Sequence, residues 1–192
     1  MLYLFHTLIV LLTVVSLLPG FRKDGAWDRG AGRRTLRYFT SLSNLFCALS
    51  SLLLLVSLPG GTPPYPVWLL RYLATAAVTV TFLTVMVHLG PMLGYKSQLS
   101  GVCFYLHLLG PLLSLAAFCF FERFYPLPLG TALLGVLPVL LYGVLYLHQV
   151  VRAERWEDFY GFNKSGKWPV SFGAMLFGTF LICLLLWFLY RI

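Results

Sequence analysis

Thr40 and His107 are of the residue types that nucleophilic catalysis requires. Thr40 lies in an apolar stretch and shares one helical face with Asn44, Cys47 and Ser51, at i, i+4, i+7 and i+11. A threonine hydroxyl becomes a good nucleophile when a base removes its proton, and histidine is the usual base near neutral pH. In this hypothesis His107 is the base, and Asn44, one turn beyond Thr40, donates to a developing oxyanion.

The predicted depths of these two side chains agree. Thr40 follows the start of the second apolar segment and His107 follows the start of the fourth, so at ~1.5 Å per residue their depths differ by only ~3 Å. Other polar residues are expected to line or support the same site: Ser43, His88, Tyr142 and Tyr146. The alternative is ordinary helix packing, because threonine and serine in membrane helices often bond to their own i−4 carbonyl or to a neighbouring helix.

Composition predicts the class of protein. The 192 residues are 59% hydrophobic and only 10% charged, which indicates an all-α integral membrane protein with a single domain, 1–192. The net charge of +8 does not indicate nucleic-acid binding, because the basic residues fall in loops between apolar segments. The four cysteines form no CxxC pair and are expected to be small buried side chains rather than disulfides or metal ligands.

Six apolar segments are each about long enough to cross ~30 Å of hydrocarbon. The first is read as a retained span rather than a signal peptide, because no basic residue precedes it and no cleavage pattern follows it. The predicted spans are 2–18, 36–58, 67–89, 101–121, 127–151 and 170–190.

Basic residues are concentrated in the loops after spans one, three and five. By the positive-inside rule these loops lie in the cytoplasm and both termini lie outside. The opposite side has only Arg71, Arg123 and Arg191, and Arg71 is expected to extend from its helix toward the interface.

Three short motifs resemble a known family. Arg37-Tyr-Phe-Thr-Ser-Leu-Ser-Asn-Leu45, Val87-His88-Leu89 and Leu106-His107-Leu-Leu-Gly-Pro111 look like the predicted six-transmembrane proteins of bacteria. More distantly, they resemble the androgen-induced transmembrane hydrolases of animals, which cleave fatty-acid esters of hydroxy fatty acids.

The resemblance implies a multi-pass protein of the bacterial plasma membrane, a threonine nucleophile at Thr40, a histidine at His107, a lipid or fatty-acyl ester substrate and no cofactor. Two features depart from the animal family. The spacing from His107 to Pro111 is one residue shorter, and the animal Trp-x-Tyr-Pro-Phe stretch has only a loose counterpart in 156–168.

Two other functions stay open. His88, His107 and His148 could hold a metal ion or a haem between helices, although no carboxylate near them would support a metal. A non-enzymatic membrane protein is the third class, and the lack of a charged pathway or an inverted repeat argues against a transporter. The aromatic loop 156–163 either covers a lipid pocket or forms part of the interfacial aromatic belt.

Overall fold

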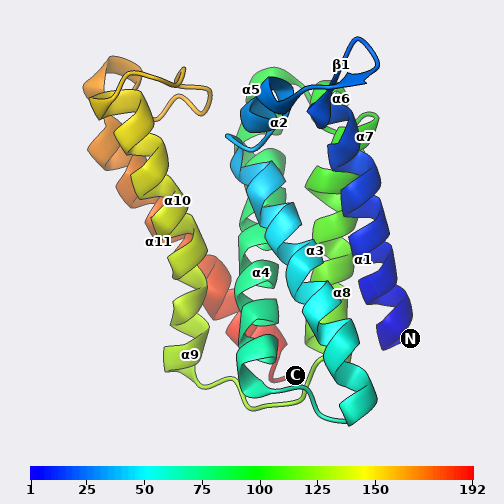
Figure 1. Ribbon diagram of the computed structural model, residues 1–192. Helices are drawn as coiled ribbons and strands as arrows, with labels where there is room; N and C mark the ends of the chain where they lie inside the picture. The colour runs from blue at the N-terminus through cyan, green and yellow to red at the C-terminus, as the bar shows by residue number, and fades with distance from the viewer.

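A computed structural model describes residues 1–192 as six long apolar helical spans that cross the molecule side by side (Figure 1). The predicted all-α fold is confirmed, and every predicted span overlaps an observed one. The chain is therefore a multi-pass helical membrane protein. The spans are Leu2–Phe21, Phe39–Gly60, Tyr65–Leu93, Val102–Phe121, Leu129–Arg152 and Trp168–Leu189.

Most spans contain a regular α-helix joined to a shorter helical piece. The long helices are α1 (Leu2–Leu17), α3 (Phe39–Ser57), α4 (Tyr65–Thr84), α8 (Gly110–Phe121), α10 (Leu137–Leu147) and α11 (Trp168–Leu189). The short α-helices are α2 (Arg29–Thr35), α5 (Gly90–Leu93), α6 (Tyr95–Gln98), α7 (Val102–Phe104) and α9 (Leu129–Leu133). Four 3₁₀ turns cover Leu18–Phe21, Leu58–Gly60, Leu134–Val136 and Lys164–Gly166, and a small antiparallel hairpin pairs β1 (Arg22–Lys23) with β2 (Ala26–Trp27).

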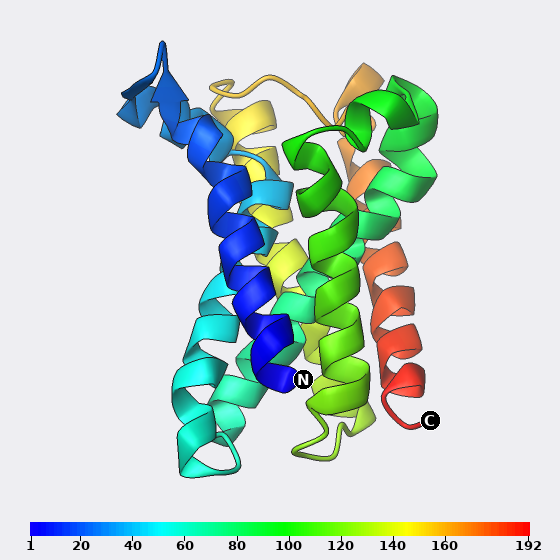
Figure 2. The same ribbon diagram turned by 90° about the vertical axis from the view of Figure 1, so that its right-hand side faces the viewer.

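Four of the long helices form one bundle, and the other two form a hairpin beside it. Helices α1, α3, α4 and α8 pack against one another, and Figure 2 shows α1 alongside α8. The hairpin of α10 and α11 packs mainly against α4. Both termini lie at the same end of the molecule (Figure 1). An aromatic cluster near this end joins the two parts and includes Trp68, Tyr72, Phe118 and Tyr190. We call this end the terminal face and the opposite end the basic face.

Three of the spans contain a π-helical segment, and each segment holds one histidine. The segments are Val85–Leu89, Tyr105–Leu109 and His148–Arg152. Two of them end at a Gly-Pro pair, where the proline cannot donate a backbone hydrogen bond. At the second pair, Gly110 donates to Tyr105 five residues back, and a Cβ on Gly110 would lie 2.9 Å from that carbonyl oxygen. Glycine and proline therefore produce the wider turns on which His88 and His107 lie.

The expectation that Arg71 extends to the interface was wrong. Its side chain is fully buried in the bundle, where Nη2 lies 2.9 Å from Oε1 of Glu122 and Nε lies 3.2 Å from Oε2. A planar guanidinium matches a carboxylate in this two-bond arrangement. Glu122 directly follows α8, so the chain places the partner carboxylate inside the bundle and Arg71 stays there.

Further polar groups complete this buried network. Arg71 also donates to Ser50 of α3 at 3.3 Å and to Ser114 of α8 at 3.2 Å. His6 of α1 places Nε2 at 3.4 Å from Oε1 of Glu122, although neither imidazole nitrogen makes a hydrogen bond. Each helix of the four-helix bundle contributes at least one side chain, so the network connects all of them near the terminal face. All four cysteines are free, and three of them are buried as expected, Cys47, Cys119 and Cys183, whereas Cys103 is only partly buried.

The orientation in the membrane can be tested by labelling introduced cysteines. Both termini lie at one end of the molecule and most Lys and Arg residues lie at the other (Figure 1). We expect Thr62→Cys, exposed at the terminal face, to react with a membrane-impermeant maleimide in intact cells. Lys164→Cys, exposed in the loop before α11, should react only after permeabilisation. The unsubstituted protein controls for its own cysteines, and the reverse labelling pattern would overturn the orientation.

Candidate active site

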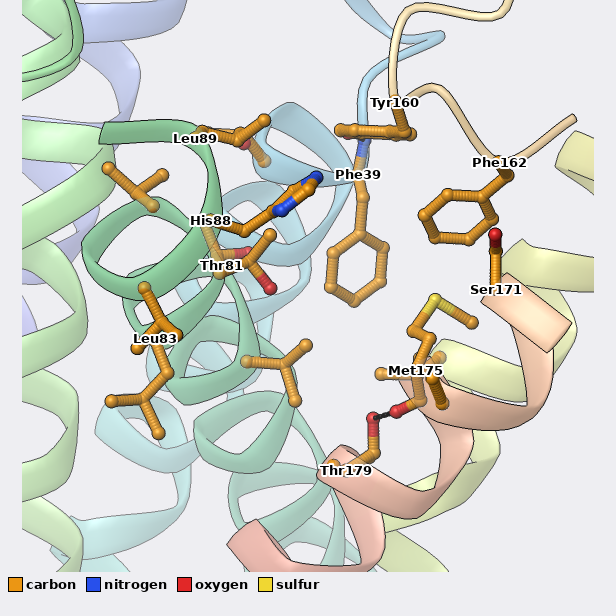
Figure 3. Close-up of a pocket in the computed structure, with 18 of the residues that line it drawn as sticks. Phe39, Thr81, Leu83, His88, Leu89, Tyr160, Phe162, Ser171, Met175 and Thr179 are labelled. Atoms are coloured by element: carbon orange, nitrogen blue, oxygen red, sulfur yellow. Dashed lines mark hydrogen bonds between the residues drawn. The ribbon is translucent and has the colours of Figure 1, made fainter. Parts of the chain in front are cut away.

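An apolar cavity of about 640 Å³ lies between α4 and α11 (Figure 3). Its walls are mostly apolar side chains of α4, α10 and α11, and Met175 and Thr179 of α11 face Thr81 of α4 across it. The start of α3 and the loop before α11 enclose the cavity toward the basic face, where Tyr160 and the other loop residues line it. Such a cavity suits an apolar ligand with one polar end.

Thr40 lines this cavity and is the second residue of α3. Its hydroxyl makes no hydrogen bond, whereas those of Thr79, Thr81 and Thr179 each donate to the carbonyl four residues back. For Thr40 that carbonyl belongs to Leu36, which precedes the helix. The hydrogen bond to the preceding turn that holds these other threonines is therefore absent at Thr40.

The start of α3 also favours negative charge near Thr40. The first backbone amides of a helix have no partner within the helix, and the helix dipole places partial positive charge there. Tyr38 before the helix gives no side-chain cap. Instead the Phe39 amide donates to the hydroxyl of Tyr160 at 2.9 Å. An alkoxide at Thr40, or an oxyanion beside it, would lie next to this positive end.

Asn44 connects Thr40 to the segment that carries His107. The Asn44 Nδ2 donates to the Thr40 carbonyl at 2.8 Å and to the Leu106 carbonyl at 3.0 Å. These two bonds use both N–H groups of the amide. In this structure Asn44 therefore holds α3 against the π segment before α8, and neither of its donors is directed at an oxyanion.

His107 is buried, and its ring orientation is fixed. Its Nδ1 lies 2.7 Å from the Gln98 carbonyl oxygen. A carbonyl only accepts, so Nδ1 carries the proton and Nε2 is left to accept one. His107 is not among the cavity-lining residues, and no hydrogen bond joins it to Thr40. The Asn44 bridge to Leu106 nevertheless places the two backbone segments next to each other.

The other predicted site residues divide between the cavity and its surroundings. His88 lines the cavity with Thr40 and is exposed, and its ring lies beside Thr81 and below Tyr160 in Figure 3. Tyr142 also lines the cavity and donates to the Arg37 carbonyl at 2.7 Å.

Besides Asn44 and His107, two more predicted residues lie outside this cavity. Ser43 bonds to Thr81 at 2.9 Å and lines a smaller neighbouring cavity of about 280 Å³. Tyr146 donates to Asp158 at 2.7 Å and so supports the loop that covers the main cavity. Both residues are therefore placed around the candidate site rather than in its wall.

The loop before α11 is part of the cavity wall, to which it contributes Tyr160, Gly161 and Phe162. Asp158 accepts hydrogen bonds from the Phe162 amide at 2.9 Å and the Asn163 amide at 2.7 Å. These bonds turn the chain so that Tyr160 and Phe162 line the cavity. An aspartate that bonds to amides a few residues ahead is a common turn signal, and it was visible in the sequence.

The three histidines proposed as metal ligands do not come together. No group of three or more His, Cys, Asp or Glu side chains lies close enough to hold a metal ion. His148 is exposed on its own π segment, outside the cavity that His88 lines. The geometry therefore gives no support to the metal or haem alternative.

Comparison with known proteins adds nothing to this geometry. No family model, no curated protein and no solved structure matches the chain.

Proposed function

We propose that this membrane protein is a hydrolase that cleaves a lipid or fatty-acyl ester, with Thr40 as the nucleophile and His107 as the base. The observation that carries the proposal is the unbonded hydroxyl of Thr40, which lies at the start of a long helix in the wall of an apolar cavity. A nucleophile needs a free lone pair, a nearby base and stabilisation of developing negative charge.

In the proposed reaction, Thr40 Oγ1 attacks the ester carbonyl carbon as its proton passes to Nε2 of His107. The carbonyl electrons move to oxygen and form an oxyanion near the positive end of α3. When the tetrahedral intermediate collapses, the alkoxide leaves with the proton from the imidazolium. Water, deprotonated by the same imidazole, then attacks the acyl-threonine. As this second intermediate collapses, the carboxylic acid leaves and the imidazolium returns its proton to Thr40 Oγ1.

His107 is proposed as the base because its other nitrogen is already fixed. The bond between Nδ1–H and the Gln98 carbonyl sets the tautomer, much as a third group orients the base in known nucleophile–base pairs. His88, which has no such partner, is exposed at the cavity wall and is proposed to contact the substrate. The resemblance to the threonine hydrolases matches the same two residues, Thr40 and His107.

The cavity favours an acyl-chain substrate. Its apolar walls lie within the spans of α4 and α11, at a depth where lipid chains are the available ligands. Thr40 lies near the basic-face end of the cavity, so a chain that fills the cavity would place its ester at that end. A hydrophobic ester with its carbonyl close to the membrane interface fits this arrangement.

The proposal can be tested by ester hydrolysis with purified protein in detergent or vesicles. Thr40→Ala should lower kcat by at least ~10³-fold, because it removes the oxygen that attacks the ester carbonyl. Thr84→Ala is the matched control, since Thr84 lines the same cavity on α4 and is outside the proposed reaction. Full hydrolysis by Thr40→Ala, or equal losses in the two variants, would refute Thr40 as the nucleophile.

A further inference from the structure

We propose that Tyr160 is a further catalytic residue of the Thr40 site and that its phenol donates a hydrogen bond to the oxyanion of the reaction. This inference rests on the proposed hydrolase function. It assigns a task to a loop residue that the sequence motifs around Thr40 and His107 do not include.

The position of Tyr160 brings its hydroxyl next to the nucleophile. The phenol oxygen lies 2.9 Å from the Phe39 amide nitrogen, and Phe39 immediately precedes Thr40 in α3. Tyr160 and Thr40 both line the apolar cavity. In Figure 3 the Tyr160 ring lies above the cavity, between His88 and Phe162.

The hydrogen bonding of Tyr160 leaves its proton available. The phenol oxygen accepts from the Phe39 amide at 2.9 Å. The Tyr142 hydroxyl beside it donates its own proton to the Arg37 carbonyl, so the Tyr160 O–H can turn from this neighbouring phenol toward an oxyanion in the cavity. Burial raises the pKa of Tyr160 to about 12, so the phenol stays neutral and keeps its proton at physiological pH. A neutral phenol beside a nucleophile can donate its O–H to a negative oxygen, which is a stronger acceptor than a neutral hydroxyl.

A chain of contacts holds Tyr160 in place without involving the substrate. Its backbone amide donates to the Tyr146 hydroxyl at 3.1 Å, and that hydroxyl donates to Asp158 at 2.7 Å. The Tyr146 ring packs against the Tyr160 ring, with centroids 5.3 Å apart. The donor is therefore oriented before a ligand arrives, which is what oxyanion stabilisation requires.

The bond changes at Tyr160 are small. When Thr40 Oγ1 attacks the ester, the carbonyl electrons move to oxygen and the Tyr160 O–H forms a hydrogen bond to that oxyanion. The phenol keeps its proton throughout, and the bond weakens when the intermediate collapses to the acyl-threonine. The proton of Thr40 goes to the imidazole and then to the alkoxide, so no additional reactant is needed.

The test compares Tyr160→Phe with Tyr95→Phe in the hydrolysis assay. Both changes remove only a hydroxyl, and the Tyr95 hydroxyl bonds to the Met86 carbonyl at 2.8 Å outside the cavity. Loss of one oxyanion donor should lower kcat by ~10²–10³-fold, with little change in KM. Tyr95→Phe should keep wild-type kcat, and the Tyr160→Phe protein should melt close to the wild-type temperature.

The possible outcomes separate this inference from the proposed function. Wild-type kcat in Tyr160→Phe, together with an inactive Thr40→Ala protein, would overturn the role of Tyr160 and leave the hydrolase proposal standing. A higher KM with unchanged kcat would identify Tyr160 as a binding residue and also overturn the inference. Activity in Thr40→Ala would instead refute the hydrolase mechanism itself.

Discussion

Replacing Glu122 with Gln is expected to lower the free energy of unfolding by about 3–5 kcal/mol. The change would leave the guanidinium of Arg71 charged and fully buried without its carboxylate partner. Water cannot replace the lost bonds in the packed bundle, so the cost of burying an unpaired charge falls on the folded state. The network joins α1, α3, α4 and α8, and the loss should therefore affect the whole four-helix bundle.

Unfolding in detergent by urea or heat measures this effect. The double variant Arg71→Met with Glu122→Leu should recover most of the lost stability, because it removes both charges and keeps much of the volume. Arg34→Ala is the surface control: Arg34 lies 3.9 Å from Asp28, both side chains are partly exposed, and only a small change is expected. Wild-type stability in Glu122→Gln would show that the buried pair does not support the fold.

Removing the imidazole of His107 is expected to lower kcat by ~10²–10⁴-fold, the usual contribution of a general base. His107→Ala removes the only acceptor nitrogen whose tautomer the protein fixes, through the bond to Gln98. The double variant Thr40→Ala with His107→Ala should be little worse than Thr40→Ala alone, because the two residues act as a unit. A multiplicative loss in the double variant would mean that they act independently.

Two other histidines serve as comparisons in the same assay. His88→Ala should mainly raise KM, because His88 lines the cavity and has no partner that would orient it as a base. His148→Ala should have no effect, since this residue is exposed and lies outside the cavity. If His88→Ala abolished hydrolysis and His107→Ala retained it, the base would have to be reassigned to His88.

The positions of the helices could be predicted from sequence because bilayer thickness sets the length of an apolar segment. The polar face of the second span was also predictable: Asn44, Cys47 and Ser51 are all buried. Helical periodicity identifies such a face within one helix. It does not identify the helix that the face will contact.

The buried ion pair shows this limit. Arg71 and Glu122 are 51 residues apart and come from different spans, so no local pattern relates them. An arginine close to the end of a membrane helix is expected to extend its side chain to the interface. Arg71 instead points into the bundle, because the carboxylate of Glu122 pairs with it there. His6 contributes to the same network from a third span.

The candidate site was predictable in part for the same reason. Equal depth suggested that Thr40 and His107 lie close, and the Asn44 bridge does connect their backbone segments. The depth of a residue in the membrane does not give the rotation of its helix about the helix axis, which decides the direction of the side chain. A π segment changes this rotation locally. Only the structure shows that the cavity beside Thr40 is lined by His88 and covered by Tyr160.

The most direct test of the central claim is to locate the covalent adduct of a fluorophosphonate probe by mass spectrometry. The purified protein is incubated with the probe in vesicles and digested, and the modified residue is identified. We predict a single adduct on Thr40 that is absent from the Thr40→Ala protein and strongly reduced in His107→Ala. A stable adduct on another residue, or none at Thr40 in protein that hydrolyses esters, would contradict the proposed mechanism.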